Sequence, residues 1–103
     1  MQMRDDNNLI MVNGVQYTAE EEDRASLILW TCVYVLTGAS VLSIDEGQRL
    51  QNLIDTHYVC DAVHMAVLCF QELTYATAYG LYSKKLDTLE TLEKLIGRQP
   101  TTI

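Results

Sequence analysis

Side chains of the kinds that bind metals or carry out catalysis cluster in one short stretch, at His57, Cys60, Asp61 and His64. On a helix, His57 with Asp61 or Asp61 with His64 could chelate a metal ion from one face. The two histidines are separated by about 10.5 Å of helix rise, so one ion cannot easily use both. The sequence holds no second copy of this pattern. We therefore predict no metal and no cofactor, with a metal-binding bundle or enzyme centred on His57, Asp61 and His64 as the alternative.

The other reactive groups give little support to catalysis. The acidic run 20–23 would suit a magnesium site only if other helices supplied matching carboxylates, and no matching Glu-x-x-Asp pattern recurs. We interpret this run as the solvated start of a helix, where the helix dipole favours anions. Cys60 lies near both histidines and could act as a nucleophile. However, Cys32, Cys60 and Cys69 all lie in apolar contexts, which indicates buried free thiols in a reducing cytoplasm.

The charge balance limits the possible partners. The 103 residues include 14 acidic and 7 basic side chains, which gives a net charge of −7. If a typical charged fraction of ~25% were split evenly, about 13 acids would be ordinary, so the unusual feature is the shortage of Lys and Arg. A nucleic-acid interface needs clustered bases. We therefore predict no direct nucleic-acid binding and a protein partner, which could present a basic surface.

Turn and capping signals predict the elements that would position these groups. Asn13-Gly14 between two short β-prone runs predicts a hairpin over 9–17. Three Ser/Thr/Asp-x-x-Glu capping boxes begin at Thr18, Ser43 and Asp87, and each predicts a helix start. The sequence thus predicts one mainly α domain over 1–103, a small bundle of three to four helices with a short N-terminal β-hairpin. The expected helices are 19–37, 44–56, 58–82 and 88–96.

The junction between the second and third of these helices contains no Gly or Pro. We expect a break or kink over 55–61, because one rod of nearly 40 residues would bury poorly in a chain this short. Trp30 and Phe70 are expected in the core. Truncating either to Ala should then destabilise the protein by about 3–5 kcal/mol.

Residues 25–44 form an uncharged stretch of 20 residues, long enough to cross a bilayer. Five Ser or Thr residues and Gly38 interrupt it, a capping box begins at its end, and its flanks lack a basic excess. We therefore expect a buried helix, a turn and the start of the next helix, with membrane association through 25–44 as an alternative.

Tyr75, Tyr79 and Tyr82 would share one stripe of a helix over 58–82, beside small residues that allow close helix approach. Tyrosine is favoured at interfaces because it combines a rigid apolar body with a polar tip. The short hairpin, with Val15 and Tyr17, is marginal by itself and must pack on the helices or pair with another chain. We therefore predict a partner or dimer interface formed by these five residues.

These features together predict a small acidic protein–protein interaction module rather than an enzyme. Its size and charge are typical of phage-encoded inhibitors, antitoxins and immunity proteins, an association that depends on no sequence motif. We expect a cytoplasmic homodimer that inhibits or regulates another protein.

Overall fold

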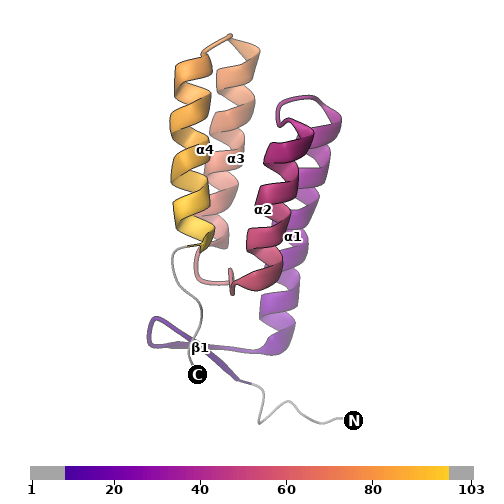
Figure 1. Ribbon diagram of the computed structural model, residues 1–103. Coiled ribbons are helices and arrows are strands. Elements are labelled where there is room, and N and C mark those ends of the chain that lie inside the picture. Colours follow the sequence, from indigo (N-terminus) through magenta and orange to yellow (C-terminus); the bar gives the residue numbers. More distant parts are fainter. Residues whose placement is uncertain (1–8, 98–103) are drawn as a thin grey trace.

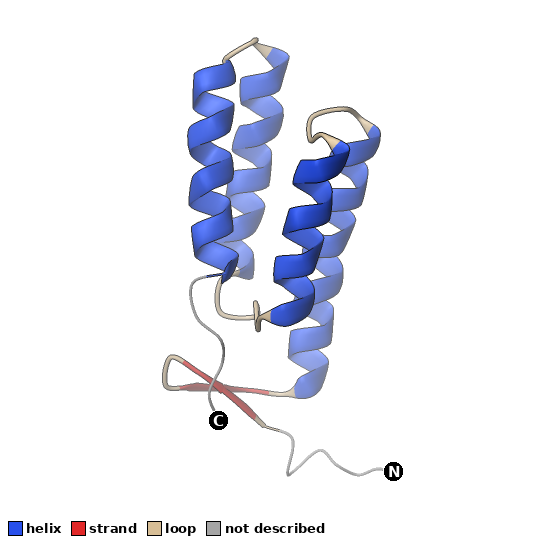
Figure 2. Cartoon of the chain, in the orientation of Figure 1, coloured by secondary structure: helices blue, strands red, loops and turns tan. Residues whose placement is uncertain are grey.

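The computed structural model describes residues 9–97 and consists of a β-hairpin followed by four helices (Figures 1 and 2). This confirms the predicted mainly helical fold with a short N-terminal hairpin. The elements are β1 (Ile10–Val12), β2 (Val15–Tyr17), α1 (Ala19–Gly38), α2 (Ile44–Thr56), α3 (Val63–Ala78) and α4 (Tyr82–Gly97).

The hairpin forms as its turn sequence predicts. β1 and β2 pair antiparallel, with Ile10 opposite Tyr17 and Val12 opposite Val15. Asn13 and Gly14 have φ values of 51° and 83°, the two positive φ values that a type I′ turn requires. The hairpin lies below the lower ends of the helices in Figure 1.

Consecutive helices run antiparallel and form two helical hairpins, α1–α2 and α3–α4, which stand side by side (Figure 1). α1 packs against α2 and α3, and α4 packs against the same two helices. Each helix therefore has two neighbours and one face turned outward.

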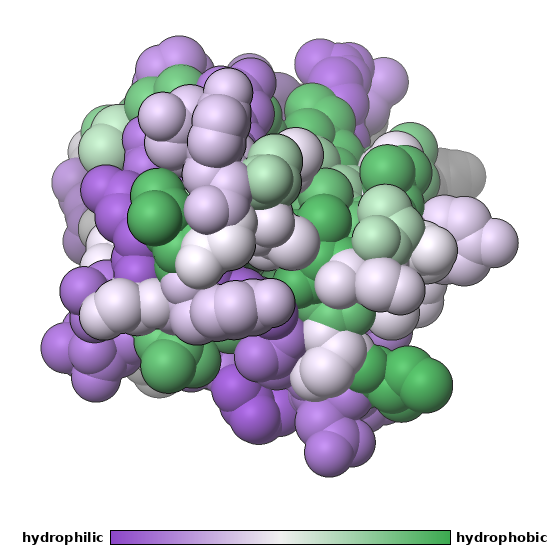
Figure 3. Space-filling model, turned by 90° about the horizontal axis from the view of Figure 1, so that it is seen from above, coloured by the Kyte–Doolittle hydropathy of each residue, from purple (hydrophilic) through white to green (hydrophobic). Residues whose placement is uncertain are grey.

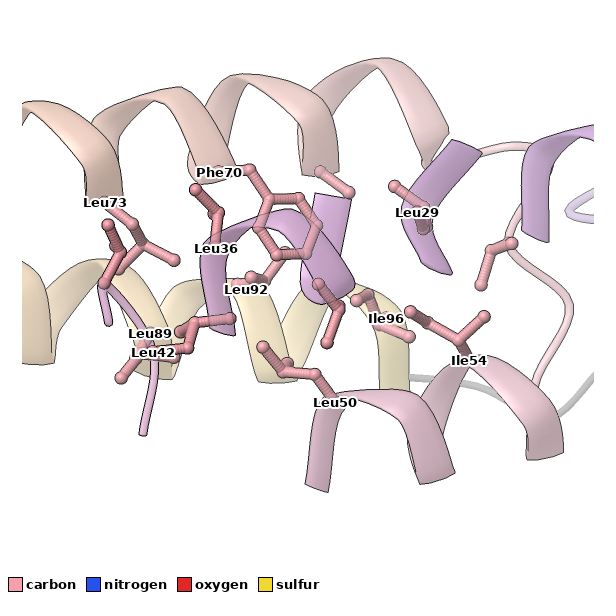
Figure 4. Close-up of a cluster of buried hydrophobic side chains, with 14 of the residues drawn as sticks. Leu29, Leu36, Leu42, Leu50, Ile54, Phe70, Leu73, Leu89, Leu92 and Ile96 are labelled. Atoms are coloured by element: carbon pink, nitrogen blue, oxygen red, sulfur yellow. The ribbon is translucent and has the colours of Figure 1, made fainter. Parts of the chain in front are cut away.

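All four helices contribute to a shared core. Its buried side chains point into the space between the helices in Figure 4. The labelled members are Leu29, Leu36, Leu42, Leu50, Ile54, Phe70, Leu73, Leu89, Leu92 and Ile96.

Capping boxes set the starts of the first two helices. The Thr18 hydroxyl accepts the Glu21 amide at 3.0 Å, and the Glu21 carboxylate accepts the Thr18 amide at 2.7 Å. Ser43 and Glu46 form the same pair of bonds at the start of α2. The predicted helices 19–37 and 44–56 agree with α1 and α2 to within one residue.

The boundaries predicted for the last two helices, 58–82 and 88–96, are wrong. α3 covers Val63–Ala78 and α4 already begins at Tyr82. Gly80 ends α3 with a φ of 69°, a conformation that glycine adopts without a steric penalty. The Asp87 box lies inside α4, where the Thr88 hydroxyl donates to the carbonyl of Lys84.

The expected break between the second and third helices is present, because α2 ends at Thr56 and α3 begins at Val63. Phe70 is buried as expected, with 3% of its surface exposed. The placement of Trp30 in the core is wrong. Trp30 is 38% exposed, and its indole Nε1 donates to Asp55 Oδ1 at 2.9 Å across the α1–α2 edge.

The uncharged stretch 25–44 does not form one continuous helix. α1 ends at Gly38, and α2 begins at Ile44 after a turn in which Val41 and Leu42 are buried. In the part of the chain that the structure describes, no helix combines the length and apolar character needed to span a bilayer.

Candidate protein-binding surface

The residues predicted as possible metal ligands are divided between a loop and a helix. His57 and Asp61 lie in the α2–α3 connection, and His64 lies in the first turn of α3. His57 Nδ1 lies 3.1 Å from the carbonyl oxygen of Leu53, and Asp61 Oδ2 accepts a bond from Asn13 Nδ2 at 2.6 Å. Among residues 9–97, no three His, Cys, Asp or Glu side chains are grouped so that they could hold a metal ion.

The cysteine thiols are poorly suited to nucleophilic chemistry. Burial raises the pKa of Cys60 to about 12, and the neighbouring Glu22 and Asp61 carboxylates add to the shift. Burial likewise raises the pKa of Cys32 and of Cys69. Because the thiolate is the reactive form, these shifts keep the thiols protonated and weakly reactive at neutral pH.

Glu22 has a role that was not predicted from the sequence. It lies within the acidic run interpreted as solvated, yet only 7% of its surface is exposed. Its carboxylate accepts the amides of Val59 (2.9 Å) and Cys60 (3.1 Å) and the hydroxyl of Ser26 (3.2 Å). Glu22 therefore fastens the α2–α3 connection to α1. Helical periodicity does indicate this burial, because Glu22 lies on the same side of the helix as the buried residues Ala25 and Leu29.

Tyr75, Tyr79 and Tyr82 are all exposed at the free end of the α3–α4 hairpin, which is the upper end in Figure 1. The Tyr75 and Tyr79 rings contact each other with centroids 4.7 Å apart. They do not form the predicted single helical stripe, because α3 ends before Tyr79 and Tyr82 begins α4. Seen from above, hydrophobic side chains are exposed in the middle of the molecule and toward its right side (Figure 3).

Val15 and Tyr17 lie at the opposite end of the molecule from the three tyrosines, in the β-hairpin below the bundle. Val15 is exposed and Tyr17 is half-buried. The five residues predicted as one interface therefore belong to two separate surfaces.

A broad exposed apolar surface lies on α1. We call it the α1 face and define it as Leu27, Ile28, Trp30, Tyr34 and Val35, all of which are large, apolar or aromatic, and exposed. Tyr34 is 72% exposed and Leu27 is 66% exposed. No charged residue occurs between Ala25 and Ile44. Because Leu29, Val33 and Leu36 fill the core side, α1 is apolar on its inner and outer sides, a pattern typical of a helix that is covered all round.

Three polar groups on or beside the α1 face form hydrogen bonds within the chain. The Trp30 indole donates to Asp55, the Thr31 hydroxyl donates to the carbonyl of Leu27 at 2.8 Å, and the Thr74 hydroxyl donates to the carbonyl of Phe70 at 3.1 Å. A buried donor without a partner costs about 1–3 kcal/mol. Covering these donors with an apolar surface would therefore carry little of that penalty.

A groove borders the α1 face on each side. On the α2 side, a groove of about 400 Å³ is lined by residues that include Tyr34, Gly38 and Ile44. On the α3 side, a groove of about 280 Å³ is lined by residues that include Cys32 and Val67. The exposed ridge of α1 thus stands between two shallow hollows.

The outer side of α2 and α4 has the opposite character. α2 carries four charged residues and α4 carries six, whereas α3 carries only Glu72. Ion pairs join the two helices, at 3.0 Å between Arg49 Nε and Glu93 Oε2 and at 3.3 Å between Lys85 Nζ and Glu46 Oε1. Apart from the charged start of α1, Glu20–Arg24, charge is therefore concentrated on the α2–α4 side.

The segment that forms the α1 face was expected from the sequence to be a buried helix or, as the alternative, a membrane span. The signal for its exposure was the even distribution of apolar residues around the helix, since only one side of α1 can face a four-helix core. Comparison with known proteins found no matching family model, no similar curated protein and no similar solved structure.

Proposed function

We propose that the protein is a small protein–protein interaction module that acts by binding rather than by catalysis. The observation that carries this proposal is the α1 face, an exposed and uncharged apolar surface on a helix whose other side is already buried. Large exposed apolar patches on globular proteins mark sites of interaction with proteins or membranes.

The biological role we propose is regulation or inhibition of another protein in the cytoplasm, as in phage-encoded inhibitors, antitoxins and immunity proteins. A net charge of −7 suits a target with a basic surface, such as a nucleic-acid enzyme. The exposed acidic side chains at the start of α1, Glu20, Glu21 and Asp23, would complement the positive charge of such a surface. The tyrosine cluster of Tyr75, Tyr79 and Tyr82 offers a second exposed surface.

Site-specific photo-crosslinking tests the proposal. Tyr34 would be replaced by a photoreactive phenylalanine analogue, and the full chain would be illuminated in an extract of its host. We expect a protein adduct of defined mass that disappears when Val35→Lys is added. The matched control carries the analogue at Thr91, an exposed position on α4, and should give no such adduct. Failure to form a defined adduct at position 34 would overturn the proposal.

A further inference from the structure

We infer that the α1 face is covered by a second copy of this chain, so that the protein is a two-fold symmetric dimer built around α1. This inference depends on the proposed function, since it names the occupant of the same surface. It moves the dimer contact away from the tyrosine cluster and onto Leu27, Ile28, Tyr34 and Val35.

The first argument is charge. In a two-fold interface each patch meets its own copy, so any charged group near the axis faces a like charge. The stretch from Ala25 to Ile44, which includes the α1 face, contains no charged residue, and the Asp55 carboxylate at the edge of this face accepts a hydrogen bond from the Trp30 indole. The α2–α4 side and the start of α1 carry the acids that would repel an identical acidic chain. The α1 face is therefore well suited to self-association.

The second argument is hydrogen bonding. An apolar copy of the same face supplies few donors or acceptors, so a surface that it covers must satisfy its own polar groups. The indole of Trp30 and the hydroxyl of Thr31 do so through Asp55 and Leu27. Nothing in these contacts requires a charged or strongly polar partner.

The third argument is size and shape. α1 has 20 residues and is about 30 Å long. With the adjoining sides of α2 and α3 at helix spacings of roughly 8–10 Å, the surface is about 25 Å wide. The uncharged part of α1, Ala25–Gly38, covers about 21 Å of that length. The resulting area of roughly 500 Å² is below the ~800 Å² that each partner buries in a standard interface and within the range of smaller, reversible ones. The ridge of α1 and its two flanking grooves allow one copy's ridge to enter the other's groove.

Such a dimer leaves the rest of the proposed function intact. The tyrosine cluster lies at the free end of α3–α4, and the acids of Glu20–Asp23 lie in the first turn of α1. Both would stay accessible to a target. Two copies of each would then be presented by one assembly.

The inference is tested by the solution mass of the full chain and its salt dependence. Light scattering at micromolar concentration should give twice the 11.7 kDa chain mass. Dimer formation should strengthen with added salt, because screening weakens the repulsion between two chains of charge −7. Binding to a basic partner would instead weaken with salt.

Matched variants locate the contact. Leu27→Lys with Val35→Lys should reduce the mass to that of one chain, with an unchanged circular dichroism spectrum. The control, Asn52→Lys with Thr91→Lys, adds the same charge at exposed positions on α2 and α4 and should remain dimeric. Trp30 is the only tryptophan and lies on the α1 face, so dilution of the unmodified chain should shift its emission to longer wavelength.

A monomer mass for the unmodified chain, or a dimer that survives the Leu27 and Val35 changes, would overturn the inference. The absence of any defined adduct at position 34, including one of twice the chain mass, would overturn the proposed function and the second copy together, whereas a monomer mass overturns the second copy alone. A defined adduct of Tyr34 with a different protein, together with a monomer mass, would support the function and reject the second copy.

Discussion

The α1–α2 hairpin and the α3–α4 hairpin reverse the chain with the same backbone turn. Ser40 and Gly80 occupy the same place in the two turns, with φ values of 62° and 69°. The amide of the next residue, Val41 or Leu81, donates to a carbonyl five residues earlier. This is the bonding pattern of a Schellman cap, which satisfies the last carbonyls of a helix.

The two hairpins differ in the residues that come directly after this turn. Val41 and Leu42 are buried, and Ser43 then caps α2. Leu81 and Tyr82 are exposed, and α4 begins at Tyr82 itself. One backbone turn therefore serves two purposes, because the first connection completes the core and the second displays apolar and aromatic side chains to solvent.

The largest expected contrast concerns two aromatic residues, Trp30 and Phe70. Each lies ten positions before the residue with positive φ in its turn, Ser40 or Gly80. Phe70→Ala on α3 removes a buried ring and should destabilise the protein by about 3–5 kcal/mol. Trp30→Ala on α1 removes a partly exposed ring and one hydrogen bond, so we expect a smaller loss, of about 2 kcal/mol. Urea unfolding followed by circular dichroism measures both, and equal losses would contradict the difference in packing between α1 and α3.

The position of Trp30 could not be predicted from the sequence. Helical periodicity identifies which residues share a face, and in α2 the residues at helical spacing, Leu50, Leu53 and Ile54, do pack together at the core. α1 is apolar all round, so periodicity could not say which side faces the core. The exposed side became evident only from the packing of α2 and α3 against it.

Helix ends capped by side chains were predictable from the sequence. Helix ends that depend on a backbone turn were harder to predict. The Thr18 and Ser43 boxes set α1 and α2 as expected. The Asp87 box has the same residue types but lies within a helix that had already begun. α3 instead ends just before Gly80, which lies within the run Ala78-Tyr79-Gly80-Leu81 and has a positive φ.

The candidate surface was partly predictable. A partner interface was predicted at Tyr75, Tyr79 and Tyr82, and all three side chains are exposed. The burial of Glu22 depends on amides of Val59 and Cys60, which are 37 and 38 residues away along the chain. The helical phase of Glu22 with Ala25 and Leu29 indicated its buried side, but a contact of that range leaves no local pattern that identifies the partner.

The close approach of α2 to α1 gives the second prediction. A Cβ added at Gly47 would lie 2.5 Å from Thr37 Oγ1, so Gly47→Ala should destabilise the protein by about 1–3 kcal/mol through overpacking. Gly38→Ala is the control, because a Cβ there meets nothing within 4 Å, and it should stabilise by about 0.5–1 kcal/mol. Thermal unfolding measures both changes. Thr37→Ala should restore part of the loss in the Gly47→Ala background.

Exchanging the turn residues tests the equivalence of the two hairpins directly. Ser40→Gly should stabilise and Gly80→Ser should destabilise, each by about 1 kcal/mol, because only glycine adopts a positive φ freely. An added Cβ at Gly80 contacts nothing within 4 Å, so the loss would come from the backbone alone. Chemical denaturation of the two single variants gives the two values, and shifts of the same sign would show that the turns are not equivalent.

The smallest expected effect lies where the two hairpins are joined by the Lys85–Glu46 pair, whose side chains are each 17% exposed. Burial by itself raises the pKa of Glu46, but the Ser43 amide and the Lys85 ammonium outweigh it, so the pKa lies below its ordinary value of 4.5. A lowered pKa contributes stability that is present above pH 4.5 and is lost as the pH falls through the folded value. Lys85→Gln should therefore reduce stability by about 1 kcal/mol at neutral pH and flatten its decline on acidification.

The exposed i,i+4 pair of Arg24 and Glu20, with 3.9 Å between charged atoms, is the control for this last prediction. Arg24→Gln removes one positive charge, as Lys85→Gln does, but from a pair that solvent screens. We expect no measurable change in the pH profile of unfolding, because such surface pairs contribute little. If both variants altered the profile equally, the effect would reflect net charge. A response confined to Lys85→Gln would assign the acid-sensitive contact to the junction between the two hairpins.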